Sequence, residues 1–305
     1  MGVYIIKRLL QSLVVILGVI VITFLISRVL GNPVVLLLPP EATAEERLAM
    51  TKDLGLDRPL YIQLGVYVSK VARLDFGQSF RFREPAMKIL LQRIPATLYL
   101  CFAASLLSVC IALPLGIISA IKRGTAVDKI AMSLALFGQS IPGFWAGIML
   151  ILLVAVKWGL LPPSGYGSPK YVVLPAISLA FFFAAATARL TRSNILDVLD
   201  MEFVRYARLK GVPERVVILR HVLRNAFISI LNIVALQTGM LFGGAVIAEF
   251  IFSWPGIGRL SLDAIYARDY PVIQATVIVI ASFFVLINLL VDIIYISTDP
   301  RVRRS

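Results

Sequence analysis

The side chains that most often perform catalysis or bind metals are scarce in this sequence. His221 is the only histidine, and the two cysteines, Cys101 and Cys110, are nine residues apart, which places them on opposite faces of a helix. No cluster of His, Cys and carboxylate residues has metal or catalytic spacing, and there is no Gly-x4-Gly-Lys-Ser/Thr phosphate loop. We therefore expect no catalytic residue, no metal site and no ATP hydrolysis by this chain.

The stretch "EFVRYARLKG", at 202–211, is a candidate binding element. Its apolar and charged side chains separate onto two faces of a helix. The apolar stripe at i, i+3 and i+4 consists of Phe203, Tyr206 and Ala207, and the other face carries Glu202, Arg205 and Arg208. Such a helix could dock on a partner protein, or it could rest on anionic lipid.

Glycine and proline punctuate the sequence that follows. Gly211 is suited to end the helix, because glycine tolerates the left-handed conformation, and Pro213 is suited to begin the next helix. We therefore predict a short helix, a sharp turn and a second helix, "PERVVILRHVLRNA", which continues into an apolar run. A loop that only joins two spans needs about four to six residues, so the length and the punctuation favour protein docking over lipid contact.

Six long uncharged runs must position this loop. They occupy residues 9–27, 94–121, 130–156, 171–188, 225–248 and 270–291. A membrane helix needs roughly 20 apolar residues, and 59% of the chain is hydrophobic, against about 45–50% in a soluble domain. The sequence predicts an all-α integral membrane protein with six transmembrane helices, in which residues 1–305 form a single transmembrane domain.

The distribution of Lys and Arg predicts the orientation of the chain. With a cytoplasmic N-terminus, the short inside segments carry 16 basic residues and the short outside loops carry 4. Both termini and the loop at 191–225 are then cytoplasmic, and segment 32–93 is an extracytoplasmic insertion. This bias, with some attraction to anionic lipid, explains the net charge of +13 without a nucleic-acid partner.

Segment 32–93 has the pattern of a small helical insertion. "TAEERLAMTKDLG" begins with a capping box formed by Thr43 and Glu46 and ends near Gly55. "PLYIQLGVYVSKVARL" repeats apolar residues at helical spacing. We expect these helices to lie on the outer membrane surface.

Polar residues within the spans are candidates to line a pathway. Gln139 and Ser140 precede Pro142, which bends the third span by removing a backbone hydrogen bond. They either line a pathway or satisfy the carbonyl groups that the bend frees. Asn232 and Gln237 add polar groups to the fifth span.

The fifth span also carries a stripe of small residues. Ala235, Gly239 and Gly243 recur every four residues and predict a helix-packing face, whose partner is either another span of this chain or a second subunit. Glu249 and Asp292 stand at span ends, where we expect solvated or paired carboxylates.

The loop at 191–225 resembles the signature loop of permease subunits of binding-protein-dependent ABC importers. Their general pattern is Glu-Ala-Ala, three residues, Gly, nine residues and an Ile-x-Leu-Pro-like end. Ala207, Gly211 and Leu223 agree with it, whereas Arg205 stands at the position of the Glu. The match is closer to the dipeptide/oligopeptide/nickel branch, whose version resembles "YARxKG…RHxLRNA". Further resemblances, in particular to the first permease subunit of that branch, occur at "LGLDRPLYIQ" (54–63), "DFGQSF" (75–80), "WPGIGRL" (254–260), "RDYPVIQA" (268–275) and "DPRVR" (299–303).

The resemblance implies a type I ABC importer transmembrane-domain fold in the bacterial inner membrane. The chain would be one half of a heterodimer with a second homologous permease subunit, and an extracytoplasmic solute-binding protein would deliver the substrate. Two cytoplasmic ATPase subunits, which bind ATP and Mg, would dock on the helix around 202–211. Either Glu202 takes the role of the missing Glu or this branch does not need it. The implied substrates are di- or oligopeptides, with glutathione, nickel or a metal chelate as alternatives.

Two other function classes stand beside the importer subunit. A membrane-embedded enzyme conflicts with the empty catalytic inventory, and a secondary transporter conflicts with the lack of ionisable residues well inside the spans. Transport that survives loss of the partner ATPases would contradict the importer hypothesis.

Overall fold

The computed structural model describes residues 2–29, 34, 38–39 and 41–298, and this part of the chain is built from helices. The stretch "DPRVR", the basic tail at 301–304 and the side chain of Asp292 lie outside that description. In chain order the helices are α1 (Gly2–Val29), α3 (Ala44–Asp53), α4 (Leu60–Ala72), α5 (Ala86–Ile121), α6 (Ala126–Ser140), α7 (Gly143–Leu150), η1 (Ile151–Lys157), α8 (Pro169–Leu199), α9 (Glu202–Leu209), α10 (Glu214–Val216), η2 (Val217–Val222), α11 (Leu223–Ile251), α12 (Ile257–Tyr266) and α13 (Tyr270–Thr298).

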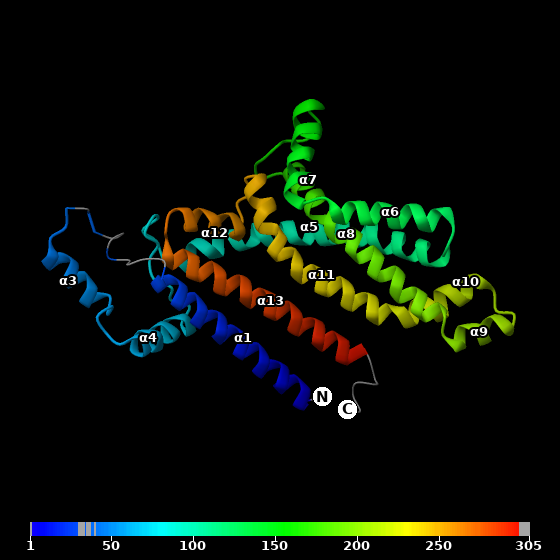
Figure 1. Cartoon of the computed structure of the whole chain (residues 1–305), viewed down its shortest axis with the longest axis horizontal. Helices are drawn as coiled ribbons and strands as arrows, with labels where there is room; N and C mark the ends of the chain where they lie inside the picture. Colours follow the sequence, from blue (N-terminus) through cyan, green and yellow to red (C-terminus); the bar gives the residue numbers. More distant parts are fainter. Residues whose placement is uncertain (1, 30–33, 35–37, 40, 299–305) are drawn as a thin grey trace.

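Five of these segments are long and apolar enough to cross a membrane: α1, α5, α8, the continuous α10–η2–α11 segment and α13. They run side by side through the body of the molecule (Figure 1). α8 lies at the centre and packs against α5, α6, α7 and α11. Small residues allow this close packing, because a Cβ atom on Gly116 of α5 would lie 2.6 Å from the carbonyl oxygen of Ala188 in α8.

The predicted bend in the third span is confirmed and is large. α6 and the α7–η1 segment meet at 95° around Pro142, and the two count as a sixth span only if they are taken together. α6 alone has 15 residues and is about 22 Å long, which is short of the hydrocarbon thickness. The α7–η1 arm projects to one side of the long helices, across their direction (Figure 1).

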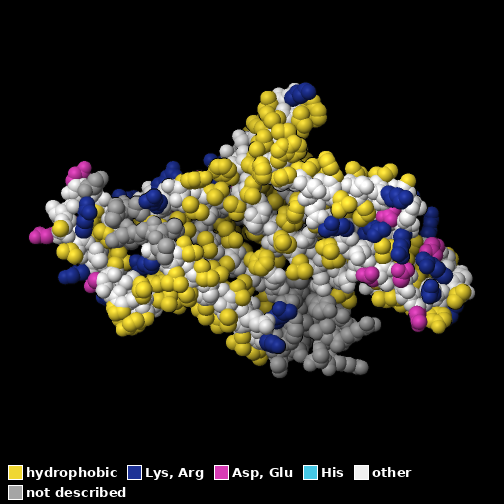
Figure 2. Space-filling view, viewed as in Figure 1, with side chains coloured by type: hydrophobic (Ala, Val, Ile, Leu, Met, Phe, Trp, Pro, Cys, Tyr) yellow, Lys and Arg dark blue, Asp and Glu magenta, His cyan; other side chains and the backbone are white. Residues whose placement is uncertain are grey.

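The charged elements gather at the two ends of the molecule, and a broad hydrophobic surface lies between them (Figure 2). The insertion helices α3 and α4 lie at one end with α12, and α9 and α10 lie at the other (Figure 1). The predicted capping box is present, since the Thr43 hydroxyl accepts the backbone N–H of Glu46 and the Glu46 carboxylate accepts the backbone N–H of Thr43. α4 packs on α1 through the rings of Tyr67 and Phe24, whose centroids are 5.6 Å apart.

Glu249 differs from the sequence-based expectation of a solvated or paired carboxylate at a span end. It is completely buried, and no basic side chain of the described residues forms an ion pair with it. Instead it accepts hydrogen bonds from the hydroxyl of Thr97 at 2.6 Å and from the backbone N–H of Arg259 at 3.0 Å. The carboxylate therefore caps the first turn of α12 from the neighbouring helix α11. Glycines at 256 and 258 make room for it, because a Cβ atom on Gly256 would overlap the carboxylate.

A second buried carboxylate fastens the insertion to α13. Asp269 accepts hydrogen bonds from the hydroxyl of Ser79 and from the backbone N–H groups of Phe80 and Arg81, the latter two at 3.1 and 3.3 Å. These contacts join "DFGQSF" to "RDYPVIQA", two stretches that are almost 190 residues apart in the sequence. The end of the molecule that carries the insertion is thus held by buried, hydrogen-bonded side chains.

Candidate functional site

The helix α9 forms at Glu202–Leu209, as the sequence predicts, and projects from the end of α8. One side chain anchors it to the body. Val204 is fully buried in an apolar cluster with Ile195 and Val198 of α8 and with Val217 and Val222 of η2. The anchor couples any movement of α9 to the ends of two long helices.

Only part of the predicted apolar stripe of α9 packs against the body of the protein. Ala207 packs against the cluster around Val204, but Phe203 is 37% exposed, Tyr206 61% and Leu209 82%. The packed positions are thus i and i+3 from Val204, a residue that the sequence analysis did not include. The exposed aromatic and aliphatic side chains form, together with the charged residues, a surface suited to contact with another protein.

The turn after α9 has the predicted conformation. Gly211 has φ +77°, in the left-handed region that favours glycine. Across the turn, the Arg208 guanidinium donates two hydrogen bonds to the Glu214 carboxylate, at 3.1 and 2.7 Å. This pairing raises the pKa of Arg208 above its usual range. Arg208 therefore closes the turn between α9 and α10 in addition to contributing to the exposed surface.

Glu202 and Arg205 are exposed, and their side chains make no hydrogen bond or ion pair with any residue that the structure describes. Their charges are available to a partner. The following helix begins after Pro213 and continues through a π-helical turn, η2, directly into α11. A π-helical turn in this position is common near functional sites, and it links the docking surface to a membrane span.

Beneath this loop lies an ion pair that the sequence analysis missed. The guanidinium of Arg192 in α8 donates to both carboxylate oxygens of Asp128 in α6, at 2.7 and 2.8 Å. Asp128 also accepts a hydrogen bond from the hydroxyl of Ser119 in α5 and one from the backbone N–H of Gly124. Three helices, α5, α6 and α8, are thereby joined at the end of the molecule that carries α9.

The pathway candidates fall into two separate groups. Ser140 donates its hydroxyl to the carbonyl of Leu136 at 2.9 Å, so it satisfies a carbonyl near the bend, and Gln139 is partly buried beside it. Gln237 borders a small cavity with Ser105 and Thr238, whose hydroxyls are 2.9 Å apart. Asn232 is partly buried on α11. Whether these residues line a pathway stays a prediction.

The small-residue face of α11 meets different surroundings along its length. A Cβ atom on Gly239 would lie 3.6 to 3.8 Å from Phe284 and Ile287 of α13, so this glycine packs against a span of the same chain. A Cβ atom on Gly243 would meet no atom of another described element within 4 Å, and Ala235 is partly buried. Among the residues with a described position, no group of three His, Cys, Asp or Glu side chains could hold a metal ion.

Comparisons with known proteins agree with this architecture. Residues 112–304 match the family "Binding-protein-dependent transport system inner membrane component", and residues 1–101 match its N-terminal counterpart. The chain is 40% identical over 301 residues to the glutathione transport system permease protein GsiC of Salmonella choleraesuis (strain SC-B67) and to GsiC of Escherichia coli (strain K12), with 98% of each chain covered.

Solved structures share the fold at low sequence identity. An inward-facing structure of the MetNI methionine ABC transporter matches with a TM-score of 0.62 and 17% identity, covering 70% of this chain and 97% of that one. An amino acid ABC transporter with histidines matches with a TM-score of 0.57 and 15% identity, covering 68% and 94%. The described helices thus have the type I ABC importer transmembrane-domain fold.

Proposed function

The chain belongs to the family of binding-protein-dependent transport system inner membrane components, and from that premise we propose that α9 is the element on which its ATPase partner docks. The chain is a non-catalytic, multi-pass permease subunit of an ABC importer in the bacterial inner membrane. This assignment excludes the two alternative hypotheses, that the chain is a membrane-embedded enzyme or a secondary transporter. Importers of this family work with ATPase and solute-binding partners.

The observation that carries the docking proposal is the mixed exposure of α9. Val204 and Ala207 fix the helix to the body, whereas Phe203, Tyr206 and Leu209 keep a large part of their side chains exposed. Aromatic side chains with a basic neighbour such as Arg205 are typical of protein interfaces. ATP and Mg bind to the ATPase subunits in this proposal, and closure of the ATPase pair moves α9.

A second homologous permease subunit completes the pathway in our proposal. The α7–η1 arm leaves the body at 95°, and much of its apolar surface, including Trp145 and Val156, is exposed. A heterodimer would cover part of this arm and of the open surface around Gly243. Residues 32–93 face outward in this arrangement, toward the solute-binding protein, and residues 191–225 face the cytoplasm.

We propose peptides as the transported class, with glutathione as the first substrate to test because it is a tripeptide and because the relatives at 40% identity are glutathione permeases. The measurement is ATPase activity of the complex in lipid, with its binding protein, against di- and oligopeptides, glutathione and nickel complexes. Stimulation by peptides or glutathione supports the proposal. Stimulation by nickel or a chelate alone would replace the substrate class and leave the importer role intact.

The docking role of α9 is tested by reversing one charge. The Arg205 side chain makes no hydrogen bond or ion pair with the residues that the structure describes, so we expect Arg205→Glu to leave the complex assembled and able to hydrolyse ATP. Transport should nevertheless fall by about tenfold or more, because the reversed charge weakens the contact through which ATPase closure moves α9. Gly211→Val should have the same effect by straining the turn at φ +77°. Arg73→Glu, on the insertion at the opposite end, is the matched control. Wild-type transport in both Arg205→Glu and Gly211→Val contradicts the proposal.

A further inference from the structure

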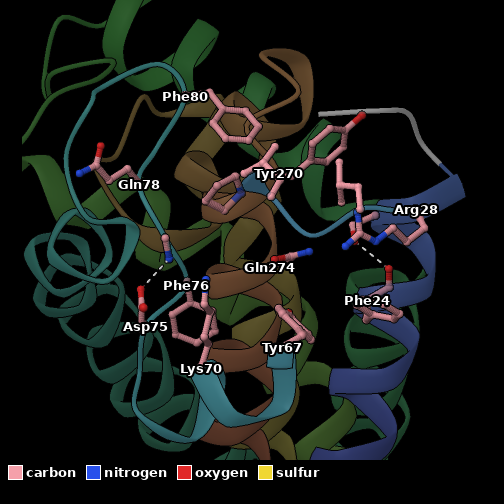
Figure 3. Close-up of a pocket in the computed structure, with 15 residues that line it drawn as sticks. Phe24, Arg28, Tyr67, Lys70, Asp75, Phe76, Gln78, Phe80, Tyr270 and Gln274 are labelled. Carbon is pink, nitrogen blue, oxygen red and sulfur yellow. Dashed lines mark hydrogen bonds between the residues drawn. The ribbon is translucent and has the colours of Figure 1, made fainter. Parts of the chain in front are cut away.

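A cavity of about 270 Å³ opens at the outer end of the molecule, between α1, the insertion and α13 (Figure 3). Its polar lining includes two basic side chains, Arg28 and Lys70, and one acid, Asp75. One carboxylate oxygen of Asp75 already accepts the backbone N–H of Gly77 at 3.0 Å. The cavity therefore has an excess of positive charge.

Two donors at this cavity lack a partner. The Nε atom of Arg28 and the hydroxyl of Tyr67 are buried without a hydrogen bond to any residue in the described part of the chain. The guanidinium of Arg28 lies over the ring of Phe24, 5.2 Å from its centroid, so the group is held in place. Burial raises the pKa of Tyr67 above its usual range, which keeps the phenol protonated as a donor. Unsatisfied buried donors favour an anionic or acceptor ligand.

A second cavity of about 220 Å³ continues from the first along the membrane-spanning surface. It lies between α1 and α13 and is lined by apolar side chains, among them Ile22, Ile26 and Val277. Ser27, Tyr270 and Gln274 border both cavities. The hydroxyls of Thr23 and Ser27 are bonded to carbonyls of their own helix, at 2.6 and 2.7 Å, so they offer the groove little hydrogen bonding.

The two cavities lie at the levels that the headgroup and the acyl chain of a membrane lipid would occupy. The apolar span of α1 ends at Arg28. With the cytoplasmic N-terminus that the distribution of Lys and Arg predicts, Arg28 lies at the outer boundary of the hydrocarbon. The polar cavity is then at headgroup level and the apolar groove is beside the acyl chains. A peptide segment in the groove would leave its backbone polar groups unsatisfied, whereas an acyl chain has none.

We propose that the two cavities form one binding site for an anionic phospholipid. The phosphodiester lies against Arg28, Lys70 and the hydroxyl of Tyr67, and one acyl chain occupies the groove between α1 and α13. The bound lipid would tie the insertion to the first and last spans. This site is separate from α9 and from the transported substrate.

The test is a lipid titration of the whole importer complex, delipidated in detergent and followed by native mass spectrometry. The ligands are phosphatidylglycerol, phosphatidylcholine with the same acyl chains, and glycerol 3-phosphate. Arg28→Gln combined with Lys70→Gln should weaken phosphatidylglycerol binding roughly twentyfold, since each basic group contributes severalfold. Lys52→Gln combined with Arg73→Gln makes the same charge change outside the cavity and should leave the affinity within about twofold.

A variant in the groove tests the acyl chain separately and does not depend on the polar variant assembling. Val277→Trp, at a partly exposed position, should fill the groove and weaken phosphatidylglycerol binding without affecting the subunit composition. Equal affinity for the two phospholipids overturns the proposal, as does unchanged binding in both variants. Binding of glycerol 3-phosphate as tight as that of phosphatidylglycerol would identify a soluble phosphate site instead. The titration uses no transport signal, so its outcome is independent of the proposed function.

Discussion

The two ends of this molecule are held together by different kinds of contact: the outer end, which carries the insertion and is proposed to face outward, and the cytoplasmic end, which carries α9 and is proposed to face the cytoplasm. At the outer end, the carboxylates of Glu249 and Asp269 are buried and accept hydrogen bonds from side chains and backbone of other elements. At the cytoplasmic end, α9 depends on the buried side chain of Val204 and on the ion pair between Arg208 and Glu214, whose side chains are both exposed. Leaving a buried hydrogen-bonding group without its partner costs about 1–3 kcal/mol, and more when the group is charged, whereas an exposed ion pair contributes about 0.2–1 kcal/mol.

This difference indicates which parts of the molecule can move relative to the others. α12 and the insertion are fixed to the spans, so the outer end should move as a unit. α9 has few attachments and an exposed apolar surface, so a partner that binds it can supply much of the energy that positions it. The buried pair of Asp128 and Arg192 marks the boundary, because it joins α6 to α8 just inside the loop.

The largest effect is expected where α12 meets α11. In Gly258→Ala the new Cβ atom would lie 2.5 Å from Cα of Val246 and 3.0 Å from the carboxylate of Glu249. Since the nearest atom belongs to the backbone, α12 must shift and disturb the hydrogen bonds of Glu249. We expect a loss of about 3 kcal/mol in the free energy of unfolding, measured by thermal unfolding of the purified complex.

Gly65→Ala is the matched control for that substitution, because it adds the same methyl group to a helical position in α4, where the new Cβ atom would meet no atom of the described residues within 4 Å. Alanine at this helical position should be neutral or stabilising by about 0.5–1 kcal/mol. Equal effects of the two substitutions would show that α12 is not tightly fastened.

A smaller effect is expected at the contact between Asp269 and the insertion. Asp269→Asn places an amide opposite the backbone N–H groups of Phe80 and Arg81, and so loses at least one acceptor at a cost of about 2 kcal/mol. The local stability of residues 75–85 should fall by the same amount. Trypsin cleavage at Arg81 and Arg83 should then accelerate by roughly thirtyfold, if the loop opens and closes faster than it is cut.

Asp263→Asn provides the comparison for this prediction. Asp263 is exposed and its nearest basic partner, Arg259, is 3.9 Å away. Its substitution should change the cleavage rate by less than about threefold. Cleavage that is insensitive to Asp269→Asn would mean that other contacts hold the loop.

The sequence predicted the elements well where local chemistry determines them. The capping box at Thr43, the bend at Pro142 and the left-handed turn at Gly211 each follow from backbone preferences of one or two residues. The apolar runs located the spans, because their length is set by the membrane. These features need no knowledge of the tertiary fold.

The buried contacts could not be predicted, because they join residues that are far apart in the chain. Glu249 stands beside a charged outer loop in the sequence, and its burial depends on α12 folding back over it. Asp269 meets Ser79 across almost 190 residues. On α9, Phe203 and Val204 are both apolar, and the face that packs depends on how η2 lies against α8.

The smallest effect is expected at the ion pair between Arg208 and Glu214, which tests how weakly α9 is attached. In a double-mutant cycle of Arg208→Gln and Glu214→Gln, the coupling between the two side chains should be below about 1 kcal/mol in thermal unfolding, because both are exposed and the pair is screened by salt. High salt should reduce the coupling further. The single substitutions should nevertheless reduce transport, since the pair sets the angle of α9 relative to α10. A coupling above about 3 kcal/mol would place this pair in the same class as the buried carboxylates, and the contrast between a fixed outer end and a weakly attached α9 would not hold.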